Sequence, residues 1–325
     1  MKANGSRLFR GLVLYTVVFN LSALCCYLFD ELLWFFAPLE AARLESYFEG
    51  AVSVTACLVS LISAWMYYSL QNREYDIFGA AADITCVAYK RPQSLTGVVF
   101  ARGKRMAPDM LCLLIAATVF FQGTALLADR ILEYILNLFG LTAAYAPAAL
   151  ADNTASPLLL LYSCIAAPAV EEIVYRGFIL KGLLPAGRNF AIIVSAVLFG
   201  LMHGDISQTL FTFLMGLLLG FVAAEYSIWW AVFIHFFNNG ILSFILGLIW
   251  IRLPGACAYM VIISLYVIAG AFTACYAAVH SKSIARYLSD GGGIAGKGIM
   301  LLNFWFIIFV FFEAAETLST ITILP

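Results

Sequence analysis

Residues 157–184 read PLLLLYSCIAAPAVEEIVYRGFILKGLL, and this stretch decides the class of the protein. It is long and apolar enough for a helix that crosses a bilayer, which needs about 20 mostly apolar residues. Two adjacent carboxylates, Glu171 and Glu172, nevertheless lie inside it. Ionisable groups at membrane depth are costly, so they usually face a protein interior or a wet cavity and serve a function. The stretch therefore predicts a membrane helix that carries part of a buried site.

The rest of the chain has the composition of a polytopic membrane protein. Of its 325 residues, 63% are hydrophobic and 11% are charged, against about 25% charged in ordinary soluble domains. We expect an all-α transmembrane helical bundle of about eight to nine spans. The predicted spans, two of them short for a bilayer crossing, are Gly11–Phe29, Ala51–Leu70, Met110–Ala128, Pro157–Leu184, Phe190–His203, Leu210–Ala224, Ile228–Trp250, Cys257–Val279 and Ile299–Leu318.

Basic residues concentrate on alternate connections between these spans. The amino-terminal tail, the loop after the second span, the turn after the Glu-Glu helix and the late loop hold 14 of the 18 Lys and Arg residues. The positive-inside rule then predicts a cytoplasmic amino terminus and, with nine spans, an outside carboxy terminus. The short loops and compact length favour a bacterial plasma membrane.

The unusual polar residues divide the chain into three regions. Residues 1–106 hold two spans and a basic cytoplasmic loop, residues 107–250 form a helical core with all the intramembrane polar clusters, and residues 251–325 add two spans. The last two spans are joined by GGGIAGKG, which predicts a flexible linker because it lacks the GK[ST] of a phosphate-binding loop. The 8 cysteines show no metal-ligand spacing and are expected to be apolar filler.

The first polar cluster, EEIVYR, has the spacing of an ion pair on one helix face. Glu172 and Arg176 are four residues apart and stack on each other, with the acid in the favourable amino-terminal position. Glu171 points about 100° away from Glu172. Arg176 can therefore neutralise one carboxylate while Glu171 faces something else, which suits a general base. The alternative is that all three form a buried ion cluster that fixes helix packing.

Two further clusters contain two of the three histidines in the chain. Phe199 and His203 share a face in FGLMH, although a lone intramembrane histidine is more often a packing residue. In HFFNN, His235 and Asn239 share a face and could donate to a developing oxyanion. Asn238 points slightly away from that face. The alternative is that these residues form hydrogen bonds between helices. At about 1.5 Å per residue, all three clusters lie at a similar depth, which predicts one shared site.

The three motifs together resemble a known family. EEIVYR fits EExxxR, FGLMH fits FxxxH and HFFNN fits HxxxN, in the order found in the CAAX-protease and bacteriocin-processing (CPBP or Abi) membrane proteins, which include the type II CAAX prenyl endopeptidase. The resemblance covers residues 157–239. It implies that Glu171 activates a water, that His203 holds and polarises it, that His235 and Asn239 stabilise the oxyanion, and that Glu172 and Arg176 support the site.

The expected function is therefore that of an intramembrane endopeptidase acting on a membrane-associated protein or a small peptide, with membrane lipid around it and no nucleic acid. No cofactor is expected. Zinc bound by Glu171, His203 and His235 is the alternative, because one carboxylate and two imidazoles can hold that metal. A membrane carrier or a non-catalytic immunity or scaffold protein would also use buried Glu, His and Arg. Against the carrier, the spans show no inverted repeat.

Overall fold

The computed structural model describes residues 2–78, 94–143, 156–292 and 300–323, and over these ranges the chain is an all-α membrane bundle, as predicted. Its elements are α1 (Lys2–Phe36), α2 (Pro38–Tyr75), α4 (Leu95–Val99), α5 (Pro108–Leu138), β1 (Leu141–Ala143), α6 (Pro157–Leu161), η1 (Tyr162–Ala166), α7 (Ala167–Glu171), η2 (Glu172–Leu180), α8 (Lys181–Leu183), η3 (Leu184–Ala186), α9 (Arg188–Leu201), α10 (Ile206–Glu225), α11 (Ile228–Phe236), η4 (Phe237–Leu242), α12 (Ser243–Arg252), α13 (Gly255–Val279), α14 (Ser281–Asp290), α15 (Phe304–Ser319) and β2 (Ile321–Ile323).

Seven helices in the described part of the chain are long and apolar enough to cross a membrane. They are Asn4–Phe36, Tyr47–Tyr75, Pro108–Leu138, Pro157–Ala186, Ile206–Glu225, Ile228–Arg252 and Gly255–Val279. Two of the nine predicted spans correspond to shorter helices, α9 with 14 residues and α15 with 16. At about 1.5 Å per residue, both are shorter than the roughly 30 Å hydrocarbon core.

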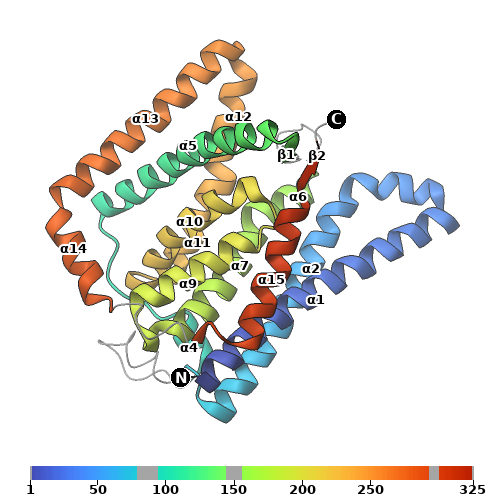
Figure 1. The fold of residues 1–325 in the computed structure, drawn as a ribbon. Coiled ribbons are helices and arrows are strands. Elements are labelled where there is room, and N and C mark those ends of the chain that lie inside the picture. Colours follow the sequence, from blue (N-terminus) through green and yellow to red (C-terminus); the bar gives the residue numbers. More distant parts are fainter. Residues whose placement is uncertain (1, 79–93, 144–155, 293–299, 324–325) are drawn as a thin grey trace.

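Long helix pairs surround a central group of short helices (Figure 1). α1 and α2 form an extended antiparallel hairpin on one side, and α5 packs against α13 on the other. η2 lies between them against α9, and α9 packs on α10. α15 returns across the bundle to contact α1 and α9, so the amino- and carboxy-terminal regions both reach the centre. β1 and β2, which the sequence did not predict, pair antiparallel with Leu141 opposite Ile323.

The best-buried part of the molecule is the helix that carries the glutamate pair. All side chains of Val174–Leu180 are buried, and they join a core with residues of α1, α2 and α9. Lys181, which the charge pattern places in a connection, lies in α8 and is also buried. α8 packs closely against Leu8 of α1 at Gly182. An added Cβ there would stand only 2.4 Å from a methyl carbon of Leu8. The linker after Asp290 falls largely outside the described residues.

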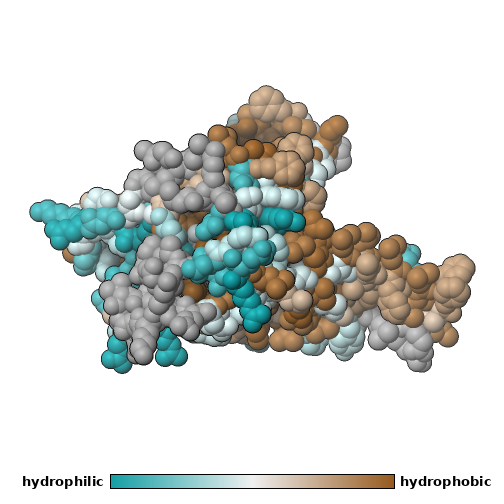
Figure 2. Space-filling model, turned by 90° about the horizontal axis from the view of Figure 1, so that it is seen from below, coloured by the Kyte–Doolittle hydropathy of each residue, from teal (hydrophilic) through white to brown (hydrophobic). Residues whose placement is uncertain are grey.

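Surface polarity is segregated in the way a bilayer requires. Large apolar side chains are exposed along α1, α12 and α13, where acyl chains would solvate them. Seen from below, the molecule shows hydrophilic residues over its centre and at its left end, and hydrophobic residues on the parts that project to the right and at the top (Figure 2).

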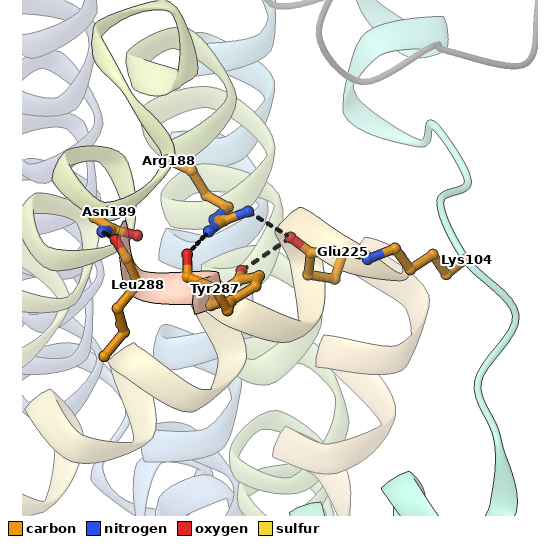
Figure 3. A network of polar contacts seen from close by, with 6 residues as sticks. All are labelled: Lys104, Arg188, Asn189, Glu225, Tyr287 and Leu288. Atoms are coloured by element: carbon orange, nitrogen blue, oxygen red, sulfur yellow. Dashed lines mark hydrogen bonds and ion pairs between the residues drawn. The ribbon is translucent and has the colours of Figure 1, made fainter. Parts of the chain in front are cut away.

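A polar network fastens α14 to the ends of α9 and α10 (Figure 3). Arg188 stacks on the Tyr287 ring, with its guanidinium carbon 3.4 Å from the ring centroid, and donates to the Tyr287 carbonyl. Glu225 accepts from the Tyr287 hydroxyl at 2.9 Å and from Lys104 Nζ at 2.6 Å. Burial and the Glu225 carboxylate raise the pKa of Tyr287. The phenol therefore stays protonated at physiological pH and remains a donor.

Replacing Glu225 by Gln is expected to loosen α14 without unfolding the bundle. Hydrogen bonds to a charged group contribute roughly 1.5–3 kcal/mol, so amide exchange across Ser281–Asp290 should rise about tenfold or more. Hydrogen exchange measured by mass spectrometry checks this. Lys104→Met is the matched control, because the Lys104 side chain is 70% exposed and an exposed pair contributes little. Unchanged exchange in Glu225→Gln would contradict the fastening role.

Candidate active site

Two of the three motifs, EEIVYR and HFFNN, lie where the helices depart from regular α geometry. The sequence predicts continuous α-helices, but η1, η2 and η4 are π-helical turns, and Glu171 and Glu172 lie at the junction of α7 and η2. Pro168 follows η1 closely; its ring lacks an N–H and disturbs the α-helical ladder one turn earlier. π-helical turns frequently occur at functional sites. They re-aim the motif side chains relative to a straight α-helix.

Glu172 is the centre of a completely buried charge cluster. Its Oε1 atom lies 3.1 Å from Arg176 Nη1, and neither side chain has any exposed surface. None of the guanidinium nitrogens has an aligned hydrogen bond among the described residues. The guanidinium instead stacks 4.0 Å from the centroid of the Phe199 ring. Ion pairing and the cation–π contact together hold this charge inside the bundle.

His235 connects the buried glutamate to the accessible one. Its Nδ1 atom lies 2.9 Å from Glu172 Oε1, and its Nε2 atom lies 3.8 Å from Glu171 Oε2. A carboxylate accepts hydrogen bonds only, so Nδ1 carries the hydrogen of the shorter contact. The Glu171 side chain is 14% exposed, while that of Glu172 is not exposed at all. Of the two acids, Glu171 is the one that a water or substrate can reach.

His203 is held in place by Phe199, the first residue of the FGLMH motif. Its Nδ1 atom lies 2.9 Å from the Phe199 carbonyl oxygen, which can only accept. Nε2 is therefore left as an acceptor. The Phe199 ring lies edge-on to both histidines, with centroids 5.0 Å from His203 and 5.8 Å from His235. Phe199 thus packs the two histidines and Arg176 around one ring.

Glu171 and His203 open into a common cavity of about 230 Å³. Side chains from α1, α2, η1 and α15 complete its wall, so segments far apart in the sequence enclose it. The lining residues are Tyr15, Thr16, Phe19, Asn20, Cys57, Tyr162, Glu171, Tyr175, Met202, His203, Glu313 and Glu316. His235 lies behind this wall and reaches the cavity through its contact with Glu171.

Asn239 belongs to a chain of amides rather than to the cavity wall. Gln122 donates to Asn238, Asn238 donates to Asn239, and Asn239 Nδ2 donates to the Ser163 carbonyl at 3.1 Å. This chain ties α5, η4 and η1 together. The structure therefore brings Glu171, His203 and His235 together but leaves Asn239 beside them, one hydrogen of its amide already committed.

Comparison with known proteins gives one family match that contains all three motifs. Residues 153–241, which contain all three motifs, match the family model described as "Type II CAAX prenyl endopeptidase Rce1-like". This match supports the CAAX protease and bacteriocin-processing family for these residues. A curated relative, "Putative membrane peptidase YdiL" of Bacillus subtilis, is 33% identical over 123 residues, which are 37% of this chain and 49% of that protein. The chain thus spans about half the length of this relative. No solved structure matches it significantly.

The described residues around the three motifs do not assemble the zinc ligand set that the sequence left as an alternative. In the described part of the chain, no group of three or more His, Cys, Asp or Glu residues is placed to hold a metal ion. His235 directs Nδ1 at Glu172, and His203 directs Nδ1 at a backbone carbonyl. Each ring keeps Nε2 free, as a metal-ligating histidine does, so the missing feature is the convergence of three ligands on one point.

The three motifs do not include the acidic residues on the opposite wall of the cavity. Glu313 and Glu316 lie in α15, far along the chain from Glu171, yet they line the same cavity. The sequence FFEAAETL did carry a signal, because carboxylates in an apolar helix are costly and usually functional. Their place beside His203 could not be read from the sequence, since it depends on α15 crossing α1 and α9.

Proposed function

We propose that the protein is an intramembrane endopeptidase that uses Glu171 to activate a water in the cavity. One observation carries the proposal: Glu171 is the accessible acid of the pair, it shares a cavity with His203, and His235 links it to the buried Glu172. A general base must stand within reach of the proton it takes, and must be held in place. The family match and the peptidase-named relative support hydrolysis of a peptide bond.

The proposed reaction is water attack on the scissile carbonyl. Glu171 takes a proton from the water while the water oxygen bonds to the carbonyl carbon, whose oxygen becomes an oxyanion. The carbon–nitrogen bond then breaks, and Glu171 returns its proton to the leaving amine. One water is consumed and two peptide ends are formed, so Glu171 ends each cycle as it began.

Each remaining motif residue has a proposed part in this reaction. His203 accepts a hydrogen bond from the water through Nε2, because Nδ1 is held by the Phe199 carbonyl. His235 stabilises the oxyanion as an imidazolium, which donates through Nε2 while its Nδ1–H is held by Glu172. Asn239 assists with the amide hydrogen that Ser163 leaves free. Glu172 and Arg176 position His235 from the buried side.

We further propose that the cavity receives a membrane-associated protein or a small peptide from the cytoplasmic half of a bacterial plasma membrane. The placement of Lys and Arg on alternate connections supports a cytoplasmic amino terminus. The hydrophilic face in Figure 2 supports an aqueous phase at that end of the bundle. A substrate that lies in or on the membrane needs no soluble recognition domain.

A comparison of membrane proteomes tests the proposal. Cells making the natural protein should contain new peptide termini that cells making Glu171→Gln lack, at equal levels of the two proteins. Identical termini in both samples, together with a loss of solute uptake in the variant, would favour a carrier and reject the peptidase.

Hydrolysis is expected to be insensitive to metal chelation. Reconstituted protein incubated with EDTA or 1,10-phenanthroline should keep its rate, because Glu171, His203 and His235 do not form a metal-binding group in the described residues. The rate of peptide hydrolysis before and after dialysis is the measurement. Loss of activity that added zinc restores would show that the residues rearrange around a metal.

A further inference from the structure

The wall of the cavity that faces the catalytic side is acidic. Glu313 and Glu316 of α15 line it together with Glu171. The carboxyl group of Glu316 lies directly over Gly204, where an added Cβ would stand 3.1 Å from the Glu316 carboxyl carbon. Gly204 follows His203 in the chain. α15 thus brings two carboxylates to the edge of the site.

No cation balances these acids inside the cavity. Among the described residues that line it there is no Lys or Arg, and the remaining polar lining groups are hydroxyls, an amide, a thiol and His203. Arg176, a buried cation of the same helix as Glu171, is already paired with Glu172. Like charges in a poorly solvated space disfavour one another, whereas a cation placed among them is strongly favoured.

Two polar groups in the wall are unpaired within the described part of the chain. Tyr175 is fully buried, and its hydroxyl has no hydrogen-bond partner. Glu313 is 97% buried as a residue and no hydrogen bond or ion pair reaches its carboxylate, although the carboxylate oxygens are not themselves fully enclosed. Buried polar groups are nearly always hydrogen-bonded in folded proteins. The unpaired hydroxyl of Tyr175, beside a carboxylate on the same cavity, therefore indicates a missing occupant.

We propose that this acidic wall is a specificity subsite that binds a Lys or Arg side chain of the peptide substrate close to the scissile bond. Glu313 accepts hydrogen bonds from the cationic head, Tyr175 supplies a further hydroxyl, and Glu316 attracts the cation at the edge. Phe19 and Met202 line the same cavity and suit the apolar stem of such a side chain. The assignment of a peptide as occupant rests on the proposed function; the preference for a cation rests on the wall alone.

Binding of matched peptides tests this subsite. The probes are acetylated, amidated Leu/Ala peptides with an uncharged fluorophore and one central residue, either Lys, norleucine or Glu. Full-length protein in lipid nanodiscs should bind the Lys peptide about tenfold or more tightly than the norleucine peptide, and the Glu peptide least. Glu313→Gln should remove most of this difference and Glu316→Gln part of it. Glu74→Gln, an exposed acid at the end of α2, should keep it.

Cleavage of the same peptides gives a second readout. Where the Lys peptide is cleaved, Glu313→Gln should raise KM more than it lowers kcat, because the subsite binds the substrate away from the reacting atoms. Equal affinity of the natural protein for the Lys and norleucine peptides overturns the subsite. An equal loss of affinity for both peptides in Glu313→Gln also overturns it. Charge-dependent binding without any cleavage supports the subsite and counts against the peptidase function alone.

Discussion

Peptide hydrolysis by Glu171→Gln is expected to fall by about 10³-fold or more. A glutamine has nearly the shape of a glutamate, but its amide cannot take a proton from water, and general bases contribute about 10²–10⁴-fold. The variant should fold normally, because Glu171 borders the cavity while the buried charge cluster is built on Glu172. The measurement is the initial rate on a peptide taken from a newly identified terminus, with protein reconstituted in lipid.

The control for this experiment is a chemically identical change away from the cavity. Glu74→Gln should retain the natural rate, since Glu74 is exposed at the end of α2. A second comparison, Glu172→Gln, distinguishes the two acids of the motif by stability as well as rate. Glu171→Gln that folds and still cleaves at the natural rate would end the assignment of Glu171 as the base.

Arg176→Met should destabilise the folded protein by about 3–5 kcal/mol. The variant leaves the buried Glu172 carboxylate with His235 but without its guanidinium counter-charge, and breaking a buried pair from one side costs about that much. It also removes the cation that stacks on Phe199. The measurement is the free energy of unfolding in detergent with a chemical denaturant, read from the aromatic signals of the core.

The double variant Glu172→Gln/Arg176→Met separates charge burial from packing. Removing both charges abolishes the unpaired carboxylate, so this variant should be clearly more stable than Arg176→Met alone. If both variants lose the same stability, the side-chain volume of Arg176 rather than its charge holds the helix. Either result shows how the Arg176 side chain stabilises the fold. The rate of hydrolysis is measured in a separate experiment.

The helical membrane class was predictable because it depends on composition. A chain with 63% hydrophobic and 11% charged residues has too few charged residues to cover its whole surface as a soluble domain does. Helix ends were less predictable: α1 begins at Lys2 and α2 ends at Tyr75, beyond the apolar runs. α9 and α15 fall short of a full span; neighbouring helices surround α9, whereas α15 has only three buried residues, Phe309, Glu313 and Thr317.

The candidate site was only partly predictable. The spacing of Glu172 and Arg176 indicated their pairing, and the similar depth of three polar clusters indicated a common site. The π-helical turns were not predicted, because their hydrogen-bond pattern depends on packing as much as on residue type. The involvement of Asn238 and Asn239 in an amide chain through Gln122 depends on how α5 lies against η4.

The sequence by itself determined the membrane environment and the polar and ionisable residues that are candidates for the site. The cost of burying charge is a property of each side chain and its local surroundings. The tertiary structure alone decided which of two adjacent acids reaches the cavity and that α15 adds two more carboxylates to it. Those outcomes depend on helix crossings between segments more than 100 residues apart. Local periodicity contains no information about such crossings.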